Sequence, residues 1–130
     1  MADAVPAAAE DLLTSEPLMA HLATSHDDRP HVAPLWYVYR DGVVELTTTG
    51  RKLANLRTNP RVALSVQKDV DGEPQWGVTL RGTATVIEDD AEAAREIRHR
   101  VNRKYGADDD EYADNASVRI DVADAEYWEY

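Results

Sequence analysis

The sequence predicts a mainly β fold of the α+β class, namely a six-stranded antiparallel barrel with flanking helices. Three observations support this prediction. The chain contains six strand-like runs, two of them arranged as a clear hairpin, and two or three helical segments lie between strands. The connections after residues 41 and 69 are too short for the crossover helix that a parallel sheet requires. A chain of 130 residues is expected to form one domain over residues 1–130.

The first 25 residues are expected to form a helix and then a strand. Residues 7–16 have a short helical pattern that turns Ala8, Leu12 and Leu13 inward. Residues 18–25 follow as a strand that ends in a polar turn.

Residues 31–49 have the clearest hairpin pattern in the chain. Two apolar, β-branched and aromatic runs flank Asp41-Gly42, a dipeptide that accepts positive φ in a tight turn. In the second arm, alternation places three side chains on one face: Val44, Leu46 and Thr48. Further strands are expected over residues 61–67, 76–88 and 116–130, with Gly82 marking a bend or bulge.

Two more helices are expected between these strands. Residues 51–58 form a short one that ends at Asn59-Pro60, because the residue before a proline avoids helical geometry. Residues 90–105 form a longer one that Asp89 or Asp90 can cap. Gly106 then occupies the position where a left-handed C-terminal cap is expected.

Composition excludes several classes of function. The net charge is −11, with 25 acidic and 14 basic residues, which disfavours binding to nucleic acid or to an anionic membrane. There is no cysteine, and the four histidines are scattered, so no metal site is expected. The acidity is consistent with a halophilic source, and an ordinary acidic cytosolic protein is the alternative. The acidic N-terminus does not resemble a signal peptide, so we expect a mature, cytoplasmic protein.

Positive charge nevertheless gathers in one place. Four of the 14 basic residues fall within positions 51–61: Arg51, Lys52, Arg57 and Arg61. Cations in the first turn of a helix are locally unfavourable because the helix dipole is positive there. With Gly50 and three threonine hydroxyls beside them, Arg51 and Lys52 suggest a site for an anion such as phosphate. The alternative is that these cations pair with nearby acids.

The strand before this stretch suggests a place for a planar group. Pro34 cannot donate a ladder hydrogen bond, so it belongs on an edge strand or at a bulge. An edge backbone beside Trp36 can receive a flat heteroaromatic ring, whereas the alternative places Trp36 in the barrel core.

These residues resemble the pyridoxamine 5′-phosphate oxidase-like family of FMN-binding split β-barrel proteins. The resemblance is carried by RPHVAPLWYVYRDGVVELTTTGRKLANLRTNPRVALSV, followed by WGVTLRGTATVIED. It implies a split barrel and a homodimer that binds FMN in clefts between its two subunits, with a small-molecule substrate.

The resemblance also implies a role for each of several residues. The backbone of Ala33, Pro34 and Leu35, together with Trp36, would lie against the flavin ring, and Thr47, Thr48 and Thr49 would contact the flavin. Arg51 and Lys52 would hold the phosphate, and Gln75 and Trp76 would complete the partner's site. The implied activity is that of a flavin-dependent oxidoreductase, and no catalytic side chain is identified.

Two departures from the family pattern narrow this implication. Arg119 is the only arginine after Arg103, so the C-terminal arginines that grip pyridoxamine phosphate in the true oxidases are missing. Position 36 is Trp where those oxidases have a basic residue. Related short members bind a deazaflavin coenzyme or haem, so a non-catalytic protein that binds or senses flavin, deazaflavin or haem is the alternative.

Overall fold

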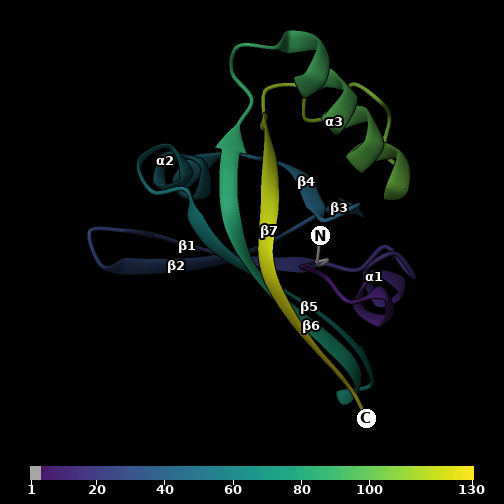
Figure 1. The fold of residues 1–130 in the computed structure, drawn as a ribbon. Coiled ribbons are helices and arrows are strands. Elements are labelled where there is room, and N and C mark those ends of the chain that lie inside the picture. The colour runs from purple at the N-terminus through teal and green to yellow at the C-terminus, as the bar shows by residue number, and fades with distance from the viewer. Residues whose placement is uncertain (1–3) are drawn as a thin grey trace.

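A computed structural model describes residues 4–130 as one antiparallel sheet with three helices (Figure 1). The seven strands lie in the order β2-β1-β5-β6-β7-β4-β3. The helices are α1 (Ala7–Leu13), α2 (Gly50–Thr58) and α3 (Ala91–Lys104). The strands are β1 (Ala20–His26), β2 (Arg29–Leu35), β3 (Val38–Arg40), β4 (Val43–Thr48), β5 (Arg61–Val70), β6 (Glu73–Val86) and β7 (Ala116–Glu129).

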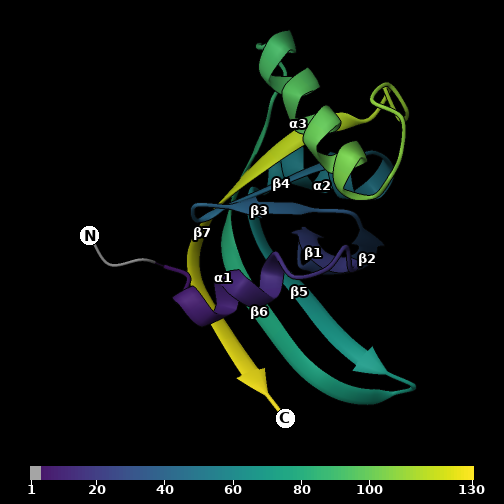
Figure 2. The same cartoon turned by 90° about the vertical axis from the view of Figure 1, so that its right-hand side faces the viewer.

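The sheet curls around an aliphatic core but does not close. Alternate residues of the central strands are buried, among them Leu22, Leu64, Val78, Leu46 and Ile120. The edge strands β2 and β3 are consecutive in the chain and lie at opposite ends of the strand order. This is the open sheet of a split barrel, and it confirms the predicted fold class. In Figure 2, α1 and α3 lie apart from each other, and the long strands β5, β6 and β7 run together toward the end marked C.

The predicted hairpin over residues 31–49 is wrong in its first arm. Residues 29–35 pair with β1, and only residues 38–40 pair with β4, so the sheet has seven strands rather than six. At the break, the Tyr37 amide donates to the Tyr105 hydroxyl at 3.2 Å, and Lys104 Nζ donates to the Tyr37 carbonyl at 2.8 Å. Side chains near the end of α3 therefore replace the strand partners that Tyr37 lacks.

The turn predictions are confirmed at Asp41-Gly42, where φ is +49° and +80°. Asp27 and Asp28 also have positive φ and turn β1 into β2. Pro34 lies on β2, an edge strand, as its missing N–H requires.

Gly82 lies at the expected irregularity in β6. The register between β6 and β7 shifts between Arg81 and Gly82. A Cβ atom at Gly82 would lie 2.3 Å from the Asp121 carbonyl oxygen, so only glycine allows this close approach of the two backbones.

The helices differ from expectation mainly at their ends. Asp90 caps α3 by accepting a 3.0 Å hydrogen bond from the Ala93 amide, and Gly106 follows the helix with φ of +75°. The longer helix is thus confirmed. In α1 the buried face consists of Ala9 and Leu13 rather than Ala8, because the helix is rotated by one residue from its predicted phase.

Candidate cofactor-binding site

One pocket brings together the ends of β2 and β4 and the first turn of α2. It encloses about 220 Å³. Seven of the predicted site residues line it: Pro34, Leu35, Trp36, Thr47, Thr48, Thr49 and Lys52. Met19, Tyr112 and Asn115 complete the lining. Segments far apart in the sequence thus converge where an edge strand meets a helix N-terminus.

The helix N-terminus at this pocket is not capped by a side chain. Thr49 has extended geometry and makes no side-chain hydrogen bond to the helix. Gly50 then turns the chain with φ of +67°, which glycine adopts without strain. The amides of the first helical turn therefore lack a side-chain cap, and the helix dipole makes their surroundings positive.

Thr48 and Lys52 give the pocket unused polar groups. Thr48 is buried, and its Oγ1 has no hydrogen-bond partner within residues 4–130. An unpaired buried hydroxyl is costly, so its place in a pocket suggests a partner outside the chain. Lys52 forms no ion pair with any described residue.

Of the three cations on α2, Arg57 forms the ion pair that the alternative interpretation expected, whereas Arg51 and Lys52 form none with the described residues. Arg57 Nε and Nη2 donate to Glu88 Oε1 at 2.9 and 2.6 Å. Neither Arg51 nor Lys52 has such a carboxylate partner in the described part of the chain. Two of the three cations of α2 are therefore available to an anion.

Aromatic side chains form one wall of the pocket. The Trp36 ring stacks on Tyr105, with centroids 4.7 Å apart and planes 4° from parallel, and Tyr112 meets it edge-on at 5.7 Å. The Tyr105 hydroxyl donates to the Leu18 carbonyl at 2.6 Å, which fixes its ring. Burial raises the pKa of Tyr105 above its ordinary value, and a hydrogen bond to the Tyr37 backbone offsets part of that rise. Trp36 is half-buried against these rings rather than enclosed in the barrel core.

Sequence reasoning missed the role of the acidic loop 107–115. Asn102 is buried in α3, and its Nδ2 donates to the carbonyls of Asp108, Asp109 and Glu111 at 2.9 to 3.1 Å. This anchoring places Tyr112 and Asn115 of the same loop at the pocket. The only sequence signal was a polar residue next to Val101 on the apolar face of the helix.

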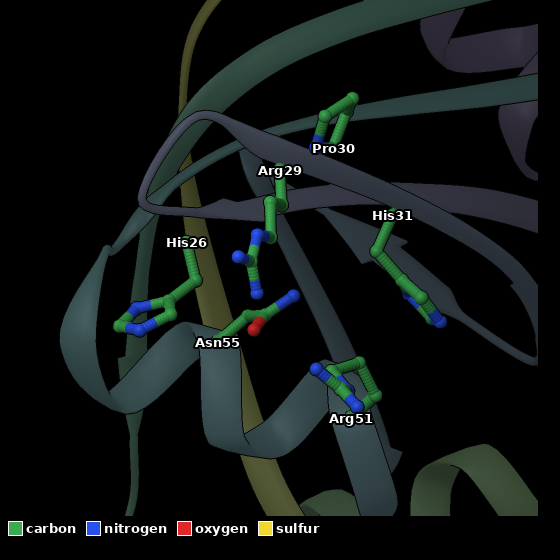
Figure 3. A pocket seen from close by; sticks show the side chains of 6 residues that line it. All are labelled: His26, Arg29, Pro30, His31, Arg51 and Asn55. Atoms are coloured by element: carbon green, nitrogen blue, oxygen red, sulfur yellow. The ribbon is translucent and has the colours of Figure 1, made fainter.

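Arg51 does not line the pocket that contains Lys52. It lines a neighbouring pocket of about 400 Å³ (Figure 3). The other lining residues of this second pocket are His26, Arg29, Pro30, His31 and Asn55. The two adjacent cations that were expected to share one phosphate therefore face two separate spaces.

Three predicted residues lie outside both pockets. Ala33 is on β2 between the two groups of lining residues. Trp76 is only 8 % exposed and packs in the core, whereas Gln75 is exposed on β6. Their role in a partner's site stays a prediction.

Residues 4–130 contain no group of three or more His, Asp or Glu side chains placed to hold a metal ion. None of the described helices is long and apolar enough to cross a membrane.

Comparison with known proteins identifies the class to which this fold and site belong. The family model for pyridoxamine 5′-phosphate oxidase matches residues 5–130. The chain therefore belongs to the pyridoxamine 5′-phosphate oxidase family. A search of curated proteins gave no match.

Solved structures of three different proteins share the fold. A FAD-binding protein from Mesorhizobium loti has a TM-score of 0.75 and 23 % identity, over 95 % of this chain and 94 % of that one. An F420 reductase has a TM-score of 0.71 and 25 % identity, over 89 % and 94 %. The haem storage protein HutZ from Vibrio cholerae has a TM-score of 0.77 and 18 % identity, over 96 % and 94 %.

Proposed function

We propose that this chain is a flavoprotein that binds FMN in the pocket of Thr48 and Lys52 and acts as an oxidoreductase on a small molecule. The observation that carries the proposal is the unpartnered, buried Thr48 hydroxyl beside an unpaired lysine at an uncapped helix N-terminus. The phosphate of FMN would give the lysine and the helix N-terminus a partner, and the flavin of the same molecule would reach the Thr48 hydroxyl.

Each part of the pocket fits one part of FMN. The ammonium group of Lys52 and the first-turn amides of α2 would bind the phosphate. The hydroxyls of Thr47 and Thr48 would hydrogen-bond the flavin, and the β2 edge at Pro34 to Trp36 would support its ring. Bound flavin supplies the electron-transfer chemistry, while the protein positions the ring and sets its electrostatic surroundings.

The relatives support a planar redox cofactor but differ in which one. The printed names of the three similar structures mention FAD, F420 and haem. FMN is our first choice because the pocket combines a phosphate-binding corner with a flat wall. A deazaflavin coenzyme or haem is the alternative cofactor.

The size of the pocket favours a homodimer. Pockets for small ligands usually measure about 300–1,000 Å³, and this one encloses about 220 Å³. One chain would thus cover a flavin only in part. A second copy would complete the site, with Gln75 and Trp76 as its expected contribution.

A non-catalytic binding or sensing protein is the second candidate. The pocket lining, as far as the described residues form it, contains no histidine, the side chain that most often transfers protons in enzymes, and no carboxylate. Turnover with NADH or NADPH and an electron acceptor would separate the enzyme from the sensor.

The test is the spectrum of the purified protein, followed by mass identification of the molecule released on denaturation. We expect flavin absorption. We also expect Lys52→Ala, and the double variant Arg51→Ala/Lys52→Ala, to lose flavin without unfolding, since both variants remove the charge-assisted contact of Lys52. Arg57→Ala is the matched control, because this cation of the same helix already pairs with Glu88.

Three results would contradict the assignment. Unchanged flavin content in the double variant would refute the assignment of the phosphate site. A sharp haem band in the native protein would replace FMN with haem. A colourless protein that binds deazaflavin in titration would replace FMN with that coenzyme.

A further inference from the structure

The residue that follows α3 reaches back to the cofactor pocket. Tyr105 comes directly after the helix, and Gly106, with φ of +75°, then turns the chain away. Tyr105 lies four residues after Val101, which is 1 % exposed, so its ring continues the apolar face of the helix toward the barrel. A side chain distant in sequence is thereby brought against the ring of Trp36, which lines the pocket.

The hydroxyl of Tyr105 joins two other segments of the chain. It donates to the Leu18 carbonyl at 2.6 Å and accepts from the Tyr37 amide at 3.2 Å. The Tyr37 carbonyl lies farther from it, at 3.3 Å, and takes a hydrogen bond from Lys104 Nζ at 2.8 Å. The single hydroxyl hydrogen therefore goes to Leu18, and the oxygen remains free to accept from the Tyr37 amide.

Both of these partners stand next to a residue of the pocket. Leu18 precedes Met19, which belongs to the pocket lining. Tyr37 follows Trp36, which belongs to the same lining. The Tyr105 ring adds a third link, because it stacks on Trp36 with planes 4° from parallel. Tyr105 is not itself among the lining residues, so it supports the wall of the pocket without facing the ligand.

These contacts act where the sheet gives no support. The strand β2 ends before Trp36 and β3 begins after Tyr37, so neither residue pairs with a strand among the described residues. Backbone without ladder hydrogen bonds depends on tertiary contacts for its order. Burial raises the pKa of Tyr105 above its ordinary value, so the hydroxyl keeps its proton, and its bond to Leu18, through the neutral range of pH.

We infer that Tyr105 is a positioning residue of the cofactor pocket, which holds Trp36 and Met19 in the places from which they contact the flavin. This inference rests on the proposed function, because it gives the wall a flavin to support. A wall that is already ordered spares the complex the entropy cost of ordering it. Tyr105 thus raises the affinity for the flavin without touching it.

The test compares Tyr105→Phe with Tyr39→Phe, since phenylalanine keeps the ring and removes the hydroxyl. Tyr39 is the matched control. Its hydroxyl also donates one hydrogen bond, to Glu10 at 2.6 Å, and accepts another, from the Gly42 amide at 2.9 Å. Tyr39 does not line the cofactor pocket. Both variants should therefore lower the melting temperature, whereas only Tyr105→Phe should weaken FMN binding.

Fluorescence titration with FMN measures this difference. It uses protein freed of bound cofactor, well below the lower of the two melting temperatures, so that both variants are folded. We expect Tyr105→Phe to raise the Kd for FMN about fivefold, and Tyr39→Phe to raise it less than about twofold. Equal effects of the two variants on this Kd would overturn the inference.

A double-mutant cycle tests the route through Trp36. The effect of Tyr105→Phe on the Kd for FMN should shrink in the Trp36→Leu background, because the wall has then lost the ring that Tyr105 holds. Tyr105→Leu, which removes the stacked ring as well, should weaken FMN binding more than Tyr105→Phe. An undiminished effect of Tyr105→Phe beside Trp36→Leu would refute the positioning role.

Tryptophan emission separates this inference from the proposed function. The emission of Trp36 is the difference between each cofactor-free protein and its Trp36→Phe version. We expect acrylamide to quench it more strongly in Tyr105→Leu than in the wild type or in Tyr39→Phe. If this holds but no flavin binds, the proposed function fails and Tyr105 still positions the pocket wall. Equal quenching in the wild type and Tyr105→Leu would refute the inference, even where flavin binds and the proposed function stands.

Discussion

At the scale of single residues, Thr48 links the fold to the proposed chemistry. Its position on β4 buries it with Val44 and Leu46, as the alternation predicted. A hydroxyl in such a place lowers the stability of the protein unless it finds a partner. Natural proteins keep such groups mainly where a ligand or a water molecule satisfies them.

Replacing Thr48 by valine tests this interpretation. Valine has nearly the same shape, so we expect Thr48→Val to leave the melting temperature of the cofactor-free protein unchanged or higher. Flavin affinity should fall about five- to tenfold, because one hydrogen bond to the cofactor is lost. Calorimetry without cofactor and fluorescence titration measure the two effects. Thr85→Val on the exposed face of β6 is the control, and a melting temperature lowered only in Thr48→Val would indicate a structural hydroxyl.

At the scale of elements, a half-buried cation at the end of α3 contacts the barrel. Lys104 Nζ lies 3.7 Å from the centre of the Tyr37 ring and donates to the Tyr37 carbonyl. Burial lowers the pKa of Lys104 to about 8. The end of α3 thus holds the break between β2 and β3 with a group that folding makes easier to deprotonate.

This pKa predicts a pH dependence of stability. Between about pH 8 and the ordinary lysine pKa of about 10.4, the unfolded chain binds more protons than the folded one, so the free energy of unfolding rises with pH. The slope should stay below about 1.4 kcal/mol per pH unit, because Lys104 is only partly buried. Urea unfolding from pH 7.5 to 9.5 measures it.

Lys104→Met should flatten the rise of the free energy of unfolding with pH. Above pH 10 the tyrosines have the opposite effect on stability. Burial raises the pKa of Tyr37, and it raises that of Tyr39 to about 12. Tyrosines that stay protonated in the folded state lower stability once the unfolded chain ionises near pH 10. An unchanged slope in Lys104→Met below pH 9.5 would refute the assignment to this lysine.

The same element shows where sequence reasoning reached its limit. Residues 31–40 are apolar and β-branched enough to be one strand, and no local signal marks a break at Trp36 and Tyr37. The break depends on Lys104 and Tyr105, which are distant in sequence and meet the Tyr37 backbone only in the folded chain. Turns and caps were predictable because their causes are local, as at Gly42 and Asp90.

Some residues of the candidate site could be predicted from the sequence, and others could not. The threonines, Lys52 and the β2 edge were predictable, since they follow from an edge-strand proline and a cation-rich helix start. Met19, Tyr112 and Asn115 were not, because tertiary packing alone brings them to the pocket. The separation of Arg51 from Lys52 was also missed, because residue types do not reveal which of two spaces a side chain enters.

At the scale of the whole molecule, the chain carries a large net negative charge of −11. The excess of 25 acids over 14 bases makes the compact state repel itself at low ionic strength. Salt screens such repulsion, and the screening length falls to about 3 Å at 1 M. The halophilic origin expected from composition therefore has a measurable consequence.

We expect the urea midpoint at pH 7 to rise as KCl increases from low to molar concentration. At pH 5, nearer the isoelectric point of about 4.6, the rise should shrink because the net charge is smaller. A midpoint that does not rise with KCl at pH 7 would end the halophile hypothesis.

Because Arg51 and Lys52 line two different pockets, the rotation of α2 about its own axis determines which side chain enters which pocket. Successive helical residues are about 100° apart, so neighbouring side chains cannot swing into the same opening while the helix keeps its place. Inserting or deleting one residue at the Thr49–Gly50 junction would rotate the whole set of cations away from both spaces. Length variation should therefore be tolerated in the β5–β6 turn and not at this junction.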